Sequence, residues 1–517
     1  MLAAPVTTRR AARRPTRAVV TSALAATALV AGVLAVVHVA GSSRQPAAAM
    51  RVRSRQPAAG VTVLAGSPAN TSAELARELL ARAPAVVVVA GAADPAQLAA
   101  AAAAARRHHA PLLLSPAGGN AQDAATLRAA LRALHPAAVF AADLSAARLA
   151  AALPGVRVVT SAAELPATVA AAPVRRVAVL VPAATQPALA SAVATTATVA
   201  DAQVISLAGD DPRTDPAAIR ALAAAKPVTV VGVGADFGSA SLLATRVAVA
   251  ETGEQLPGGG QVLFPGREIV ALYGTPFYPA LGALGQQDLA ASIARAKALA
   301  AQYAALTSVP VVPGFEIIAT VASASPGPGD TYSQVFSVAA LQPWVQAATK
   351  AGLYVTLDLQ PGRASFLAEA KLYQPLLELP NVGLALDPEW QLQPGQLPLQ
   401  QIGSVTIAEV NSVASWLASL TATYRLPQKL LELHEFRLSM IQDIQQLDTD
   451  HDDLAIVINM DGQGSPGAKL QTWQAVVAGA PKGVFFGWKD FYVEDRPMLG
   501  PAQTIDHDPT PVVISYQ

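Results

Sequence analysis

Carboxylate side chains stand at the ends of two short apolar runs in the second half of the chain. Asp358 lies near the end of LYVTLDL (353–359). Asp387 directly follows VGLAL (382–386), and Glu389 stands two residues further on. The helix-like segment SFLAEAKLYQPLLEL separates the two runs. Buried strands that alternate with helices predict a parallel sheet, whose ligands gather at the carboxyl ends of the strands, so we expect these carboxylates to meet.

Further polar groups are expected at the same end of the sheet. Side chains alternate between the two faces of a strand, so the segment KLLELH places Glu432 and His434 on one face. In LAIVINMD the same alternation turns Asn459 and Asp461 inward. The rim of the sheet is therefore predicted to hold Tyr273, Asp358, Asp387, Glu389, His434, Asp461, Trp488 and Lys489.

Paired carboxylates on such a rim, with aromatic rings beside them, indicate binding and cleavage of sugar polymers. One carboxylic acid protonates the leaving oxygen of the glycosidic bond, while a second carboxylate acts as nucleophile or base. We expect either Glu389 or Asp387 to be the acid. Its partner is expected to be Asp461 or Asp358. The residues predicted to bind the substrate are Tyr273, Trp390, His434, Trp488 and Lys489.

Other roles remain open for these residues. Asp387 before Pro388 is also typical of a turn cap, Glu389 of a solvated side chain, and His434 of a hydrogen-bonded core histidine. A non-catalytic protein that only binds glycan or another protein is one alternative function. A metal-dependent hydrolase such as a deacetylase is another, because oxygen and imidazole ligands suit zinc, magnesium or manganese. Our first interpretation includes no metal and no cofactor; the alternative ligands are Asp358, Asp387, His434 and Asp461.

Two further acidic positions are interpreted as structural. Glu316 comes early in the predicted strand FEIIATVA, so we expect it low in the sheet, within a buried polar network. The run DTDHDD at 448–453 is similar to the opening of a calcium loop. It lacks the glycine that such a loop needs at its sixth position. We therefore predict a solvated turn.

Eight strand-like segments, with helical segments between them, fill residues 266–517. They begin near residues 267, 315, 353, 381, 429, 453, 482 and 511. Eight alternating strands and helices over about 250 residues predict a (β/α)8 TIM-type barrel. The glycine-rich sequence LPGGG at 256–260 marks the boundary with the preceding region.

This second region resembles a group of exported bacterial proteins of unestablished function with a glycosidase-like barrel. The shared phrases are LDLQPGR, VGLALDPEW, IGSV…AEVN, KLL.LH.F, MDGQG and GW…FY.ED.PM. The resemblance transfers no activity. It implies that five residues belong to motifs of the group, namely Asp358, Asp387, Glu389, His434 and Asp461.

Residues 60–262 alternate β-rich runs with alanine-rich helical stretches, which predicts a layered α/β domain with mainly parallel strands. The succession of VVVVAG, an alanine-rich helix and PLLLSP resembles the cell wall-binding repeat of the second type. This resemblance implies binding to a cell-wall polymer. A two-lobed solute-binding domain is the alternative fold.

The amino terminus predicts export. Arg9, Arg10, Arg13, Arg14 and Arg17 precede a mostly apolar run at 18–40, which is long enough to span a bilayer. We predict an uncleaved signal anchor in residues 1–41, or a signal peptide cleaved after Ala49, and a linker at 42–59. Because arginine-rich flanks stay on the cytoplasmic side of a membrane, the chain after the apolar run is expected outside the cell. It would be anchored in the cell membrane if the run is kept and secreted if it is cleaved.

The composition narrows the partners of the protein. The 517 residues carry equal numbers of basic and acidic side chains, 36 each, so no electrostatic footprint for nucleic acid is present. The chain has no cysteine, which excludes disulfides, thiolate metal sites and a cysteine nucleophile. The partners expected are a cell-wall or extracellular glycan and, through the amino-terminal helix, the membrane.

Overall fold

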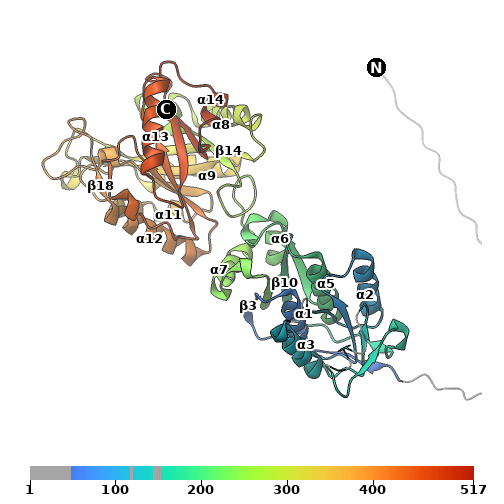
Figure 1. Ribbon diagram of the computed structural model, residues 1–517. Helices are drawn as coiled ribbons and strands as arrows, with labels where there is room; N and C mark the ends of the chain where they lie inside the picture. Colours follow the sequence, from blue (N-terminus) through green and yellow to red (C-terminus); the bar gives the residue numbers. More distant parts are fainter. Residues whose placement is uncertain (1–47, 117–119, 144–147, 150, 152) are drawn as a thin grey trace, which may run out of the picture. The chain divides into compact units, whose positions relative to one another are not determined.

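The computed structural model describes residues 48–116, 120–143, 148–149, 151 and 153–517 (Figure 1). The predicted signal anchor at 1–41 lies outside these residues. Within the described part, no helix combines the length and the apolar character needed to cross a membrane.

A closed ring of eight parallel strands forms the second region. Around the ring the order is β13-β23-β22-β21-β19-β17-β16-β14, and pairing of β14 with β13 closes it. This confirms the predicted (β/α)8 barrel. The strands are β13 Glu268–Gly274, β14 Val311–Ala322, β16 Tyr354–Leu359, β17 Val382–Leu386, β19 Lys429–His434, β21 Leu454–Met460, β22 Phe485–Asp490 and β23 Val513–Tyr516.

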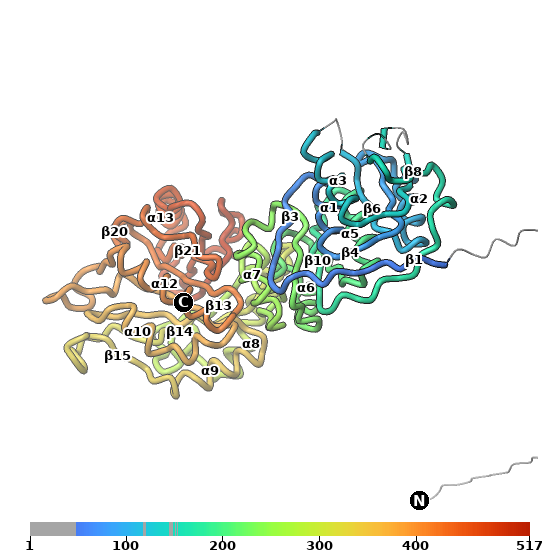
Figure 2. The backbone as a smooth tube through the Cα atoms, turned by 90° about the horizontal axis from the view of Figure 1, so that it is seen from below, coloured from blue at the N-terminus to red at the C-terminus, as the bar shows by residue number. Residues whose placement is uncertain are grey.

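Helices between the strands cover the outside of the barrel (Figures 1 and 2). Several begin at a serine, threonine or aspartate whose side chain accepts a backbone N–H of the first turn, as Asp288 does for α8 and Ser465 for α13. α8 packs against β13 and β14, and α12 packs against β19. The helices are α8 Leu289–Ala304, α9 Val338–Ala351, α10 Phe366–Leu372, α11 Gln374–Leu377, α12 Ile407–Tyr424, α13 Pro466–Gly479 and α14 Pro501–Ile505.

Alternation along the strands separates an outer core from an inner one. Val355, Leu357 and Leu359 of β16 face outward and belong to the large core between strands and helices. Tyr354 faces inward and packs with Ile269 and other apolar side chains in a smaller cluster inside the barrel. This inner cluster fills the part of the barrel near the amino ends of the strands. The inward side chains nearer the carboxyl ends are polar, so the site rests on an apolar floor.

A close approach inside the barrel explains one glycine of β17. A Cβ atom on Gly383 would lie 2.9 Å from the Tyr354 hydroxyl and 2.8 Å from the Leu430 carbonyl oxygen. The missing side chain leaves room for the Tyr354 ring, whose hydroxyl accepts the Leu430 N–H at 3.0 Å.

The first region contains two parallel four-stranded sheets, as the alternating β-rich and alanine-rich runs predicted. One sheet has the order β6-β5-β7-β8 and the other β11-β10-β12-β3. Its strands are β3 Gly60–Leu64, β5 Ala85–Ala90, β6 Leu112–Ser115, β7 Ala138–Ala141, β8 Arg157–Val159, β10 Val177–Pro182, β11 Gln203–Leu207 and β12 Thr229–Val233. Its longer helices are α1 Pro68–Leu79, α2 Pro95–Arg107, α3 Ala121–Leu134, α5 Pro187–Ala200, α6 Pro216–Ala225 and α7 Ala240–Ala250. The predicted linker is partly ordered, because β1 Met50–Arg51 pairs with β9 Thr168–Val169 and β2 Arg53–Ser54 pairs with β4 Leu80–Arg82.

The acidic turn at 448–453 was predicted to be solvated, but one of its carboxylates forms ion pairs. Asp452 forms ion pairs with Arg213 at 2.9 Å and with Arg246 at 2.7 Å, and its side chain is 29% exposed. Two guanidinium groups therefore neutralise this carboxylate.

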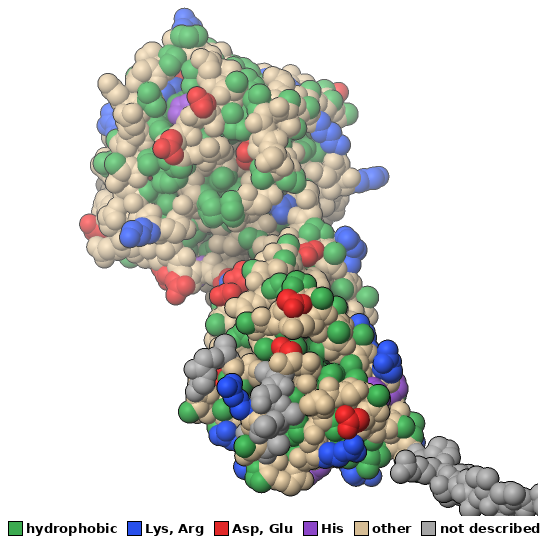
Figure 3. Space-filling model, turned by 45° about the vertical axis from the view of Figure 1, so that its right-hand side comes forward, with side chains coloured by type: hydrophobic (Ala, Val, Ile, Leu, Met, Phe, Trp, Pro, Cys, Tyr) green, Lys and Arg blue, Asp and Glu red, His purple; other side chains and the backbone are tan. Residues whose placement is uncertain are grey.

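Elsewhere on the surface, Lys and Arg side chains are scattered over the face shown in Figure 3.

Candidate active site in the barrel

The carboxyl ends of the barrel strands bring together most of the predicted site residues. Tyr273, Asp358, Asp387, His434 and Lys489 are each at most 3% exposed, and Asp461 is 7% exposed. Glu389 follows β17 in the short 3-10 helix Pro388–Trp390 and is only partly buried. Asp358, Glu389 and Asp461 each act electrostatically on Asp387, so the four carboxylates lie near one another; their predicted catalytic role stays a prediction.

His434 lies between two carboxylates. Its Nε2 atom is 2.7 Å from Glu316 Oε1, and its Nδ1 atom is 3.2 Å from Asp461 Oδ2, an ion-pair distance without hydrogen-bond alignment. Burial alone would lower the pKa of His434, but the charges of Glu316 and Asp461 outweigh burial and hold the pKa well above its usual value. The two carboxylates therefore favour the protonated form of His434. Its predicted contact with substrate stays a prediction.

Glu316 was expected low in the barrel and lies instead at mid-height. β14 begins at Val311, so Glu316 is the sixth residue of the strand and pairs with Tyr273 and Thr356. Its place in a buried polar network is confirmed by the contact with His434. Glu316 was not predicted as a site residue because its strand was expected to begin four residues later than it does.

Asp358 and Asp387 share a hydrogen-bond network. The Tyr273 hydroxyl donates to Asp358 Oδ2 at 2.9 Å, and Gln360 Nε2 donates to Asp387 Oδ2 at 3.4 Å. Burial raises the pKa of Asp358 to about 6, although the charge of His434 lowers it. Burial and the charge of Glu389 raise the pKa of Asp387 well above its usual value. Burial and neighbouring negative charge therefore both favour the protonated form of Asp387.

Glu389 has the environment of a general acid. Burial, and after it the charge of Asp461, raise the pKa of Glu389 to about 7, against the opposing charges of Lys489 and His434. Lys489 itself lies over the Tyr273 ring, with Nζ 3.3 Å from the ring centroid. Since a catalytic acid works best with a pKa near the working pH, Glu389 can donate a proton at neutral pH.

Two glutamates that were not predicted as site residues extend the acidic cluster. Glu432 is fully buried and accepts a short hydrogen bond from Asn459, and burial and the charge of Glu316 raise its pKa to about 8. Burial and the charge of Asp461 likewise raise the pKa of Glu435 to about 8. Alternation indicated the inward face for Glu432. It gave no signal for Glu435, which directly follows the inward residue His434.

Several buried polar atoms of the cluster have no hydrogen-bond partner. Buried polar groups in folded proteins are nearly always paired, so such atoms point to a proton, water or ligand. The unpartnered atoms include Glu316 Oε2, Asp358 Oδ1, Asp387 Oδ1, Glu432 Oε2, Asn459 Oδ1 and Asp461 Oδ1.

The two predicted sugar-stacking tryptophans lie in different environments. Trp390 is partly buried beside Glu389. Trp488 is fully buried in the outer core, with its ring centroid 5.7 Å from that of Trp473 and 4.1 Å from that of His507. The predicted rim position of Trp488 is therefore wrong. Neighbouring residues of a strand face opposite sides, so Lys489 faces inward and Trp488 cannot.

No known protein family, curated protein or solved structure matches this chain. The interpretation of the site accordingly depends on its own geometry.

Proposed function

We propose that the barrel hydrolyses glycosidic bonds in a cell-envelope or extracellular polysaccharide. The observation that carries this proposal is the state of Glu389, a partly buried acid at the carboxyl end of β17 with a pKa of about 7. Glycosidases pair such an acid with a second carboxylate across the scissile bond.

Asp461 is the partner of Glu389 in this proposal. Its charge is, after burial, the largest influence on the pKa of Glu389, and its Oδ1 atom has no hydrogen-bond partner. Asp358 and Asp387 are less suited to the reaction because they are at most 1% exposed and bound by Tyr273 and Gln360. Glu389 would protonate the leaving oxygen, and Asp461 would act as nucleophile or as base toward water.

The choice of an envelope polysaccharide comes from the rest of the chain. The arginine-rich amino terminus with its apolar run favours export, either tethered to the membrane or secreted. The resemblance of residues 60–262 to a wall-binding repeat favours a polymer of the cell wall. Trp390, beside Glu389, offers an apolar face to a sugar ring.

The test is a comparison of variants on defined polymers. Purified wall polysaccharide and peptidoglycan would be incubated with the full-length protein, and new reducing ends would be counted. Glu389→Gln should lower kcat/KM by about 10²–10⁴-fold, the usual contribution of a general acid. The matched control is Glu369→Gln, which removes a buried carboxylate of α10 that Thr320 and Ser333 bind. Absence of new reducing ends with the wild-type protein, or equal rates in Glu389→Gln, would overturn the proposal.

A further inference from the structure

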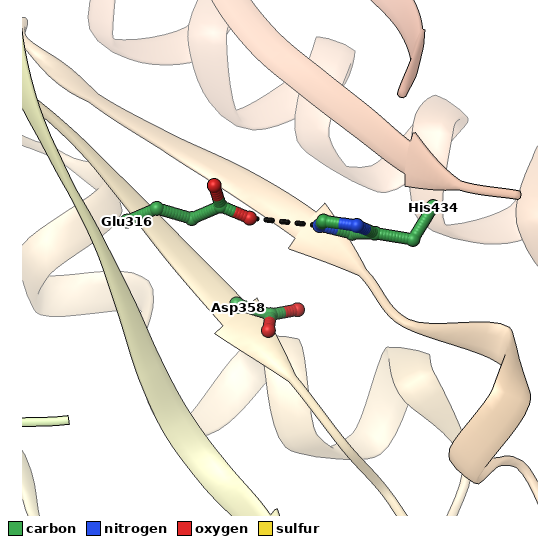
Figure 4. A group of neighbouring side chains, drawn as sticks. All are labelled: Glu316, Asp358 and His434. Carbon is green, nitrogen blue, oxygen red and sulfur yellow. Dashed lines mark hydrogen bonds and ion pairs between the residues drawn. The ribbon is translucent and has the colours of Figure 1, made fainter. Parts of the chain in front are cut away.

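Three side chains converge in the interior of the barrel, below Glu389. Glu316 on β14, Asp358 on β16 and His434 on β19 each present one potential ligand atom, and these atoms lie within 4.8 Å of one another. All three side chains are at most 1% exposed. Figure 4 shows Glu316 and His434 pointing at each other, with Asp358 beside them.

The carboxylates of this group have unused lone pairs. Glu316 Oε2 and Asp358 Oδ1 are buried and lack hydrogen-bond partners. The second oxygen of each is bound, Glu316 Oε1 by His434 and Asp358 Oδ2 by Tyr273. The cluster thus combines two features of an ion site. Its potential ligand atoms lie close together, and two of its buried oxygen atoms have no hydrogen-bond donor.

The surroundings of His434 match those of a metal-binding imidazole. A histidine that binds a metal through one nitrogen usually directs the other toward a carboxylate or carbonyl, which orients the ring. Here Nε2 lies 2.7 Å from Glu316 Oε1, and Nδ1 lies 3.2 Å from Asp461 Oδ2. Asp461 therefore lies beside the second nitrogen, where its charge can hold the ring in place while Nε2 binds an ion.

We propose that Glu316, Asp358 and His434 Nε2 bind one divalent first-row cation, zinc or manganese. One imidazole and two carboxylates suit these ions, whereas calcium prefers six to eight oxygen ligands. Neighbouring ligand atoms around tetrahedral zinc are about 3.3–3.6 Å apart, given bonds of about 2.0–2.2 Å. The contact of 2.7 Å between His434 and Glu316 would therefore lengthen, and the proton on Nε2 would leave to solvent as the cation takes its place.

This ion site differs from the ligand set considered in the sequence analysis. That set comprised Asp358, Asp387, His434 and Asp461. In the structure Glu316 replaces Asp387, which binds Gln360, and Asp461 lies on the far side of the imidazole. The inference does not depend on glycoside hydrolysis, because it is tested by binding alone.

The test measures metal content and thermal unfolding of the full-length protein. After treatment with a chelator and dialysis against ZnCl2 or MnCl2, we expect about one bound ion per chain and a higher Tm. CaCl2 should raise the Tm less. His434→Gln, Glu316→Gln and Asp358→Asn should each weaken binding by at least about tenfold, and Asp461→Asn by about 10–100-fold, as for other groups that orient a ligand.

Glu369→Gln is again the matched control, since it removes a buried carboxylate of the same barrel without touching the three ligands. It should bind zinc or manganese like the wild type. If circular dichroism shows that His434→Gln does not fold, Glu316→Gln and Asp358→Asn decide. Failure of the wild type to bind either ion, or equal binding in the folded ligand variants, would overturn the inference. Loss of metal binding in the ligand variants with intact glycan hydrolysis would support the ion site and show that hydrolysis does not depend on it.

Discussion

Both regions of this protein place an aspartate just beyond the end of a parallel strand, and the two side chains are used differently. In the first region Asp143 follows β7, and both of its oxygens accept the Ala90 N–H, at 2.9 and 3.2 Å. In the barrel Asp461 follows β21, faces His434 with one oxygen and has no partner for the other. An acid at a strand end is thus a candidate for chemistry only when part of it remains unbound.

The largest effect expected from this difference is on Asp461. We expect Asp461→Asn to lower kcat/KM on the polysaccharide substrate by about 10²–10⁴-fold, because the amide cannot act as nucleophile or base. Rates would be measured as new reducing ends, with circular dichroism to verify folding. A folded variant with wild-type activity would remove Asp461 from the mechanism and leave Glu389 without its proposed partner.

The tryptophans allow a second comparison, between the core and the site. Trp488→Ala should lower the free energy of unfolding by about 3–5 kcal/mol, because it leaves a cavity beside Trp473 and His507. Trp390→Ala should instead raise KM, with little change in unfolding. Urea denaturation and steady-state kinetics on both variants separate the two roles. Similar stability losses in both would contradict the different positions described for them.

The pH dependence of kcat/KM gives a smaller but more specific effect. Glu389 must be protonated to act as the acid, so kcat/KM should fall about tenfold per pH unit above its pKa of about 7. The sign follows from the raised pKa, since the active form is the protonated one and is lost as pH rises. The charged groups that set this pKa are Asp461, Lys489, His434 and Asp358, and Glu389 in turn acts on Asp387. The pKa of about 7 lies between pH 6 and pH 9. A kcat/KM that is unchanged over this pH range would rule out Glu389 as the acid.

Alternation of side chains was enough to predict the barrel and most of its interior. It assigned Glu432, His434, Asn459 and Asp461 to the inward face, where the structure has them buried. It also forbids adjacent residues from sharing a face, a rule that the prediction for Trp488 and Lys489 broke.

The position of Glu316 could not be predicted because its strand begins with residues that are unfavourable in strands. Pro313 and Gly314 lie inside β14, where they read as a loop in the sequence. In the structure Gly314 is tightly packed, since a Cβ atom there would lie 3.1 Å from Ile269 and 3.2 Å from Ala271. Contacts between distant segments therefore override the local preference, and they are not visible in one sequence.

The smallest expected effect is on Asp143, the counterpart of Asp461 in the first region. Asp143→Asn should change kcat/KM by less than about twofold, because its oxygens already bind the Ala90 N–H. It should lower the free energy of unfolding by about 1 kcal/mol, since a charged acceptor binds an amide more strongly than a neutral one. Thermal unfolding and the reducing-end measurement on the same protein would show both effects. A large loss of hydrolysis with unchanged stability would mean that the first region takes part in the reaction, and the contrast between the two aspartates would no longer hold.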